Sequence, residues 1–487
     1  MKTAFPPHQL ITRNTAFLFS AQLVTKIIGF AALILLANYL NVEQYGSYNF
    51  LLAFATLFIP LCDLGIDTFL VRELAAQSDD RGKLVGTTLI LKAGLSLLVL
   101  AVMTGLLLVS SQLRDHSIFG LMAGLIIILR TYSSSFTALF RGDQRMGLDA
   151  RATVVSKFFE LAAMLLAVLL KASLSHLLML LLASSFLQVL YAYNLARRMS
   201  YLQYLSFSGS TLVLLVKGGL PFALTGISVM IYFQIDTVLL SFLSGERAVG
   251  IYRAATNLVN ALSGFSAAVV VALFPLVAQN YQQCLESAVR ISSNAIYYSL
   301  LIALPIAVGT TVLSHAIIGS LYKETFADAT LTLQILIWWL PVMFVTNILG
   351  HVMGAIKLQK LVLGVSSVNA VFNILLNLIL IPIYADRGAA IATVATEVLG
   401  LGVLSLLVIK KFGLIFDRRR LTKLIVANLA IIPIVFMSSL LNVFLVILIA
   451  GALYVGALFG LKAISIEELV ELKRLVFTRT PQPASVS

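Results

Sequence analysis

Long apolar runs alternate along this chain with short polar stretches that hold most of its charge. A helix needs about 20 apolar residues to span a bilayer, and runs of that length recur from one end of the chain to the other. The runs do not show the residue-by-residue alternation of a membrane barrel. The pattern therefore predicts an all-α polytopic membrane protein with fourteen transmembrane helices. They are expected at 14–40, 47–66, 86–110, 117–140, 152–170, 175–195, 215–243, 251–276, 291–314, 331–354, 358–383, 388–409, 421–440 and 442–462.

Composition supports this class and narrows the functions. The 487 residues are 60% hydrophobic and 11% charged, whereas soluble domains carry about 25% charged residues. The first apolar run is too long for the core of a signal peptide, so we expect it to be a retained helix. Cys62 and Cys284 have no disulfide or metal-binding spacing, and no metal site is predicted. The net charge of +13 is typical of basic cytoplasmic loops, and nucleic acid is not an expected partner.

The loops fix a predicted orientation. One set of loops holds many basic residues, among them Arg141, Arg145 and the run Arg418–Arg420, whereas the other set holds few. Because cytoplasmic loops carry the excess of Lys and Arg, the first set is expected inside, with both termini cytoplasmic. The tail after Ser465 begins like a capped amphipathic helix, which predicts a segment on the inner membrane surface.

An internal echo predicts two related halves. Val42–Tyr48 resembles Glu246–Tyr252, with Gly46 over Gly250. Six helices in each half would give parallel repeats, and transporters of that kind bind substrate where the repeats meet. The predicted organisation is an N-terminal lobe at 1–200, a C-terminal lobe at 201–412, two further helices at 413–464 and a cytoplasmic tail at 465–487.

Several short motifs carry a family resemblance: Gln44–Tyr48, Asp63–Asp67, Gln234–Asp236, Val249–Tyr252 and Asp386–Thr393. With these motifs in this order, the sequence resembles the Wzx-type polysaccharide and O-antigen flippases of the multidrug/oligosaccharidyl-lipid/polysaccharide (MOP) exporter superfamily. The resemblance covers essentially the whole chain.

The resemblance implies a V-shaped transporter, not an enzyme, in the bacterial cytoplasmic (inner) membrane. It implies that an undecaprenyl-pyrophosphate-linked oligosaccharide moves from the inner to the outer leaflet by alternating access. The product would serve polysaccharide, lipopolysaccharide O-antigen or exopolysaccharide biosynthesis. The implied partners are that substrate, membrane lipids and the polysaccharide polymerase machinery. No cofactor is implied, and coupling to Na⁺ or H⁺ is left open.

Cations within the predicted spans are the candidates for substrate binding. A pyrophosphate that loses its water needs charge-assisted hydrogen bonds from Arg or Lys. Lys26, Arg130 and Arg253 are the expected substrate-binding residues. Lys92 lies closer to the cytoplasmic end of its helix, and we expect it to snorkel to the inner surface.

Carboxylates at similar depth are candidates for ion coupling or gating, since an unpaired charge there is costly. They are Asp236, Glu160 and Glu397. Arg130 and Glu160 are each about ten residues from their shared loop, which would let them meet. Asp236 and Arg253 flank Gly245 almost symmetrically, and this spacing predicts an ion pair whose loss would leave a buried charge alone.

Two other functions compete with a flippase. A drug or cation antiporter related to MATE transporters would have twelve helices and an acidic cavity, so the extra helix pair and Lys26 count against it. A membrane oligosaccharide polymerase or ligase would need a large outer loop carrying Arg and His, but the longest outward loop, His315–Ala329, is short. The sequence lacks the Gly-rich phosphate loop of an ATPase.

Reporter tags test the predicted orientation. A tag after Gly245 or Arg387 is expected to report the outer side, because those loops are poor in basic residues. A tag after Gly142 or Arg419 is expected to report the inner side. An inward report from the Gly245 position would contradict the two-lobe arrangement.

Overall fold

The regular elements of this computed structural model are α- and 3-10 helices throughout the residues that it describes. These residues are 7–76, 80–109, 117–199, 202, 204–283, 285–356, 358–412, 418–437 and 441–464. They form two compact units. Unit 1 consists of residues 1–261, 322–332 and 366–393, and unit 2 of residues 262–321, 333–365 and 394–487.

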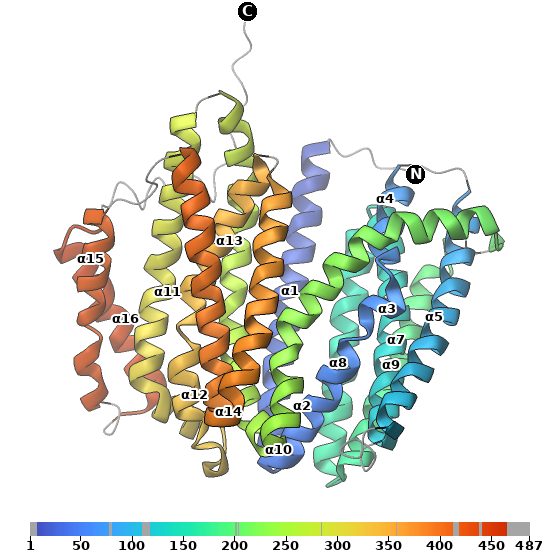
Figure 1. The fold of residues 1–487 in the computed structure, drawn as a ribbon, viewed down its shortest axis with the longest axis horizontal. Helices are drawn as coiled ribbons and strands as arrows, with labels where there is room; N and C mark the ends of the chain where they lie inside the picture. Colours follow the sequence, from blue (N-terminus) through green and yellow to red (C-terminus); the bar gives the residue numbers. More distant parts are fainter. Residues whose placement is uncertain are drawn as a thin grey trace, which may run out of the picture. The chain divides into compact units, whose positions relative to one another are not determined.

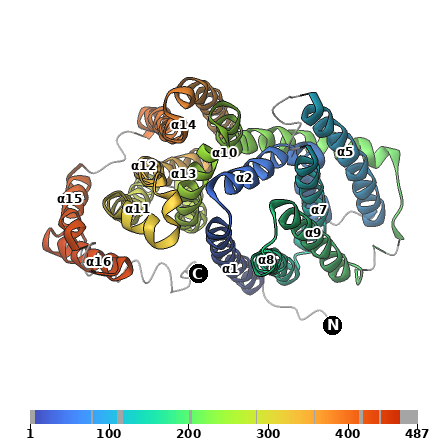
Figure 2. The same cartoon turned by 90° about the horizontal axis from the view of Figure 1, so that it is seen from below.

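Unit 1 is built around a group of neighbouring helices that Figures 1 and 2 show in blue to green. Helix α8 packs against α1 and α9, while α7 packs against α4, α5 and α9. Buried residues of α4 and α7, including Phe69, Leu70 and Phe140, form the centre of its core. The helices are α1 (Pro7–Tyr39), α2 (Val42–Thr56), α3 (Ile59–Asp63), α4 (Ile66–Ala75), α5 (Arg81–Val109), α7 (Ser117–Gly142), α8 (Met146–Leu169), α9 (Leu174–Ala196), the part of α10 (Gly209–Gln283) up to residue 261, η2 (Glu324–Phe326), and the parts of α12 (Ala329–Leu336) and α14 (Gln359–Phe412) at 329–332 and 366–393.

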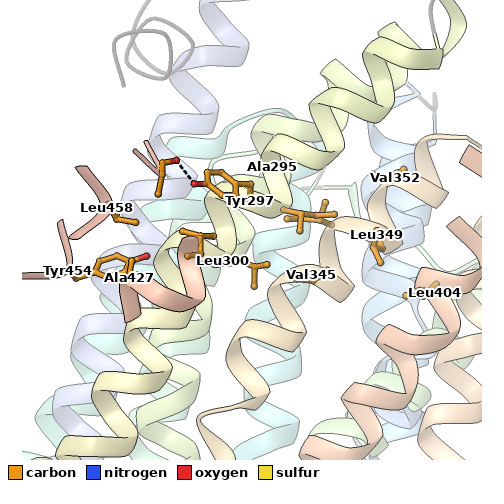
Figure 3. Packing of buried hydrophobic residues seen from close by; sticks show 14 of the residues in the cluster. Ala295, Tyr297, Leu300, Val345, Leu349, Val352, Leu404, Ala427, Tyr454 and Leu458 are labelled. Atoms are coloured by element: carbon orange, nitrogen blue, oxygen red, sulfur yellow. Dashed lines mark hydrogen bonds between the residues drawn. The ribbon is translucent and has the colours of Figure 1, made fainter. Parts of the chain in front are cut away.

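Unit 2 has its own apolar core, drawn in Figure 3. Helix α11 packs against α13, α15 and α16. The Tyr297 hydroxyl donates a hydrogen bond to the Ala463 carbonyl, and the Arg420 guanidinium lies 5.5 Å from the centre of the Tyr297 ring. The core therefore attaches the last two helices to unit 2. Its elements are α11 (Leu285–Leu321), α13 (Trp339–Ala355), α15 (Arg418–Leu429), η3 (Ile432–Met437) and α16 (Val443–Gly460), with the part of α10 after residue 261 and the remaining parts of α12 and α14.

The polytopic helical class is confirmed, whereas the count of fourteen spans stays a prediction. Eleven helical segments among the described residues are long and apolar enough to cross a membrane. Two of them, Gly209–Ser263 and Gln359–Lys411, each contain two predicted helices. Within the predicted helix at 421–440, the described residues belong to two shorter elements, α15 and η3. The tail at 465–487 lies outside the described residues.

Sharp breaks divide the two longest helices. Helix α10 breaks at Gly245, whose φ of 83° lies in the region that glycine adopts without steric cost. Helix α14 breaks at Ala385 with φ 49°. The Ser244 hydroxyl donates to the Ile381 carbonyl at 3.3 Å, which ties the two breaks together within unit 1. Each long element is therefore a pair of helices joined by a tight turn.

The second predicted helix, at 47–66, is also interrupted. It divides into α2, α3 and α4, and both Leu64 and Gly65 have left-handed φ, at 47° and 69°. A Cβ on Gly65 would lie within 3.0 Å of the Gly219 carbonyl oxygen of α10. This close approach of two backbones explains why the chain has glycine here. Two aspartates, Asp63 and Asp67, flank the break.

The echoed motifs meet in a reciprocal helix crossing. A Cβ on Gly46 of α2 would lie within 3.0 Å of the Glu246 carbonyl oxygen, and one on Gly250 within 3.0 Å of the Val42 carbonyl oxygen. Val42 and Glu246 are the positions that correspond to each other in the echo. The Ser47 hydroxyl also donates to the Glu246 carboxylate. The two motifs therefore contact each other through the positions that correspond in the echo.

The compact units do not follow the predicted lobes. The segment 209–261, expected in a lobe at 201–412, belongs to unit 1 with the N-terminal helices. The contacts of α2 with α10 at the glycine crossing account for this, because they join that segment to the start of the chain. The division into two homologous lobes stays a prediction.

Substituting the crossing glycines should destabilise the protein. Gly46→Ala or Gly250→Ala forces two backbones apart, and overpacking of this kind costs about 1–3 kcal/mol. The unfolding midpoint of the purified protein in detergent should fall for both variants. Gly105→Ala is the matched control, because a Cβ there would meet nothing within 4 Å. Unchanged stability in the Gly250 variant would contradict the tight crossing.

Candidate functional site

Asp236 of α10 lies at the centre of a buried polar cluster in unit 1. Its side chain is 5% exposed. The Tyr252 hydroxyl and the Thr393 hydroxyl donate to Oδ2 at 3.0 and 2.7 Å. The Asn377 amide donates to Oδ1 at 2.7 Å. A carboxylate at membrane depth needs such partners, because leaving it without them is costly.

Oxygen atoms from α14 complete this cluster. The Asn377 amide nitrogen also donates to the main-chain and side-chain oxygens of Asn373, at 2.9 and 3.1 Å. The Asn377 Oδ1 is buried and accepts no hydrogen bond from the described residues. Carboxylate, amide and hydroxyl oxygens are the ligands that hard cations take. Asp236, Asn373, Asn377 and Thr393 therefore fit a small cation such as Na⁺, which would draw on the unused amide oxygen.

The predicted ion pair between Asp236 and Arg253 is wrong. Arg253 instead donates from Nε to the Asn49 side-chain oxygen of α2, at 3.3 Å. The spacing about Gly245 sets the depth of Arg253 but not the direction in which it points. Consecutive residues point about 100° apart on a helix, and it is Tyr252, the preceding residue, that faces Asp236. The carboxylate is held by neutral donors.

The predicted meeting of Arg130 and Glu160 is confirmed. The Arg130 NH2 lies 3.2 Å from the Glu160 carboxylate. Lys157, one turn before Glu160 on α8, pairs with the same carboxylate at 2.7 Å. Two cations thus share one carboxylate, which leaves a net positive charge at the contact of α7 with α8.

Partly exposed cations lie near α2. The buried Tyr48 of α2 is within electrostatic reach of Arg130, Glu160 and Arg253. Arg130 and Lys157 keep 28% and 37% of their side chains exposed. Lys26 is exposed on α1, which packs along α8. The elements α1, α7, α8 and α10 therefore each contribute a cation within a candidate span.

Glu397 belongs to unit 2. It is 5% exposed on α14, and the Trp339 indole donates to its carboxylate at 3.4 Å. Its role in ion coupling stays a prediction.

The expectation for Lys92 is wrong. Its side chain is 1% exposed, and Nζ lies 2.6 Å from a carboxylate oxygen of Asp63 and 2.6 Å from one of Asp67. A lysine within a span extends its side chain to the surface when water there is the available polar partner. Here the break after α3 brings two carboxylates within reach of the Lys92 ammonium group instead. The sequence signal for this buried contact of Lys92 was the spacing of the two aspartates, which lie four residues apart.

Sequence reasoning also missed most partners of Asp236. Tyr252 and Thr393 belong to motifs that carried the family resemblance, although no role was assigned to them. Asn373 and Asn377 lie four residues apart in an apolar run, and that spacing places two amides on one helix face. Polar residues repeated at helical spacing inside a span were therefore the signal for this cluster.

Two family models match the chain. A model described as polysaccharide biosynthesis protein matches residues 11–281. A model described as MatE matches residues 221–379.

Two curated proteins are similar in sequence. One is an uncharacterized membrane protein of Methanocaldococcus jannaschii, 28% identical over 264 residues; the match covers 51% of this chain and about half, 51%, of that protein. The other is the probable low-salt glycan biosynthesis flippase Agl15 of Haloferax volcanii. It is 24% identical over 388 residues, which cover 79% of this chain and 80% of that protein.

Solved structures show the same fold. The lipid II flippase MurJ in an inward closed conformation has a TM-score of 0.77 at 15% identity, covering 93% of this chain and 99% of that chain. A multidrug resistance MATE transporter of the MOP superfamily in an inward-facing conformation has a TM-score of 0.63 at 15% identity, covering 79% and 94%. At these identities the similarity establishes the fold alone.

Sodium should stabilise the protein through the Asp236 cluster. A ligand at 100 times its dissociation constant raises folding stability by about 2.7 kcal/mol. The unfolding midpoint should therefore rise with NaCl more than with choline chloride of equal ionic strength. Asp236→Asn should abolish this difference, whereas the control Asp149→Asn, at a buried carboxylate paired with Arg141, should keep it. An equal Na⁺ response in the Asp236 variant would exclude the cluster as the site.

Proposed function

Because the chain belongs to the polysaccharide biosynthesis protein family of the MOP exporter superfamily, we propose that it flips a lipid-linked oligosaccharide across the membrane. The substrate we propose is an undecaprenyl-pyrophosphate-linked oligosaccharide, carried from the inner to the outer leaflet of a bacterial cytoplasmic membrane. The oligosaccharide then enters surface polysaccharide synthesis. The relative from Haloferax volcanii, named as a probable glycan biosynthesis flippase, supports this proposal over most of the chain.

The main structural support for this proposal is the set of cations around α2. Arg130, Glu160 and Arg253 lie within electrostatic reach of Tyr48, and Lys157 pairs with the same Glu160 carboxylate as Arg130. A diphosphate that leaves water requires charge-assisted hydrogen bonds, which arginine supplies in a planar fork and lysine as a point charge. An excess of partly exposed cations within apolar spans is costly, and an anionic headgroup would offset that cost.

Cation coupling is the second part of the proposal. The Asp236 cluster joins both helices of α10 to α14, because Tyr252 follows the Gly245 break and Thr393 follows the Ala385 break. A cation bound there would favour the arrangement in which these helices meet, and its release would favour another. Its oxygen set supports Na⁺ as the coupling ion.

A MATE-like antiporter for drugs or other cations is the alternative, favoured by the match of the MatE model to residues 221–379. Such a transporter needs a cavity that attracts cations. The excess of Arg130, Lys157 and Arg253 over Glu160 opposes this. A reconstituted protein that exports a cationic dye and leaves lipid-linked oligosaccharide in place would establish the alternative.

Substituting the cations should impair flipping. A hydrogen bond to a charged group contributes about 1.5–3 kcal/mol, so Lys26→Ala and Arg253→Ala should each lower the flipping rate roughly tenfold or more. The measurement is translocation of a fluorescent undecaprenyl-pyrophosphate oligosaccharide in vesicles. Lys26→Arg should keep part of the activity.

Lys83→Ala is the matched control for charge, because Lys83 pairs with Asp80 and both side chains are exposed, at 47% and 66%. It should flip at the normal rate. Normal flipping by Lys26→Ala would mean that Lys26 reaches the membrane surface and does not contact the substrate.

A further inference from the structure

The break between α3 and α4 buries a lysine between two carboxylates in unit 1. Asp63 ends α3 and Asp67 lies in the first turn of α4, and the Lys92 ammonium of α5 lies 2.6 Å from each. Lys92 also donates to the Ser135 hydroxyl of α7 at 2.6 Å. Its Nζ also donates to the Thr131 carbonyl of α7 at 3.4 Å, so the ammonium group has four acceptors, from α3, α4 and α7. This triad of Asp63, Lys92 and Asp67 is separate from the Asp236 cluster in its residues and elements.

With both aspartates ionised, the triad has an excess of one negative charge, because two carboxylates share one ammonium group. Excess charge in a poorly solvated site is expensive, and gaining a proton removes it. The site is not sealed: the side chains of Asp63 and Asp67 are 17% and 14% exposed, whereas that of Lys92 is 1% exposed. Water can therefore reach the carboxylates but not the ammonium group.

The two carboxylates differ in how fully they are bonded. Asp67 accepts Lys92 on Oδ1 and the Ser134 hydroxyl on Oδ2. Asp63 accepts Lys92 and the Asp67 amide, the latter at 3.3 Å, on Oδ1 alone. Its Oδ2 accepts no hydrogen bond from the described residues. That oxygen is the one with capacity for a proton.

A thiol and a phenol are the other titratable side chains found near the triad among the described residues. Cys62 of α3 and Tyr132 of α7 lie within electrostatic reach of Lys92. From α10, the groups packed at the break are the Gly219 backbone and Phe222. The charge balance of the site among the described residues therefore depends on the two aspartates and Lys92.

We propose that this triad is a proton-binding site that takes its proton on Asp63 Oδ2. A hydronium ion gives one proton to the carboxylate and leaves as water, while Lys92 keeps its contacts with Asp67 and Ser135. Proton binding itself does not depend on what the protein transports. Its role as a second coupling site, besides the Asp236 cluster, rests on the proposed flippase function.

The position of Asp63 connects proton binding to the backbone. Leu64, the next residue, holds a left-handed φ of 47°, and Gly65 packs against the Gly219 carbonyl of α10. Pairing with Lys92 anchors the end of α3 at this break. Neutralising Asp63 removes the charge part of that anchor, so protonation would favour a different angle between α3 and α4.

Infrared difference spectroscopy tests the site on the full-length protein in lipid vesicles. Lowering the pH also protonates exposed carboxylates, so the signal is the carbonyl-stretch band that the unmodified protein shows and Asp63→Asn lacks, equivalent to one group per chain. Asp149→Asn should keep it, because Asp149 is buried and paired one-to-one with Arg141. A full band in the Asp63 variant, or no band in the unmodified protein, would overturn the proposal.

Lys92→Gln provides a second measurement should Asp63→Asn fail to fold. Without the ammonium group the carboxylates repel each other, so the band should appear at a pH higher by roughly one to three units. An unchanged midpoint would overturn the site. In flipping assays Asp63→Asn should lose its dependence on external pH. If the band behaves as expected while no glycan lipid is flipped, proton binding stands and the proposed function fails.

Discussion

A charged side chain at membrane depth must be paired, hydrogen-bonded or turned toward water, and this constraint organises the polar interior of the protein. The charged groups meet this requirement in different ways. Asp236 is held by neutral hydroxyl and amide donors, and Lys92 by two carboxylates. Arg130 and Lys157 share Glu160 and remain partly exposed. The differences matter because a charge balanced by one opposite charge is structural, whereas a charge without an equal counter-charge has capacity for an ion or a charged ligand.

Close backbone contacts place these charges. The crossing of α2 with α10 at Gly46 and Gly250 brings Asn49 within reach of Arg253. The contact of Gly65 with Gly219 sets the break that turns Asp63 and Asp67 toward Lys92. A methyl group at either contact would push the helices apart and carry the charges with them. Packing and electrostatics are therefore coupled at the same positions.

The cation cluster and the two carboxylate sites suggest a division of labour within unit 1. Cations around α2 suit an anionic headgroup, while the Asp236 oxygens suit a metal cation and the Asp63 triad suits a proton. Both ion sites lie beside breaks in helices, at Gly245 and Ala385 for the first and at Leu64 and Gly65 for the second. Backbone interruptions at membrane depth are tolerated where the freed groups line a polar site.

The sequence by itself determined the helical membrane class, most helix positions, the break at Gly245 and which side chains are charged at depth. It also indicated the echo that pairs Gly46 with Gly250, and the meeting of Arg130 with Glu160 across a short loop. These features depend on spacing along one helix or between two neighbours, which composition and period encode locally.

The tertiary structure decided which partner each remaining charge has. Asp236 bonds to Tyr252 and Thr393 and not to Arg253, and Lys92 turns inward to two aspartates. Those outcomes depend on the rotation of each helix about its axis and on breaks such as Leu64–Gly65. This rotation is set by packing against helices that are distant in the sequence. It therefore cannot be read from the spacing of residues along one segment.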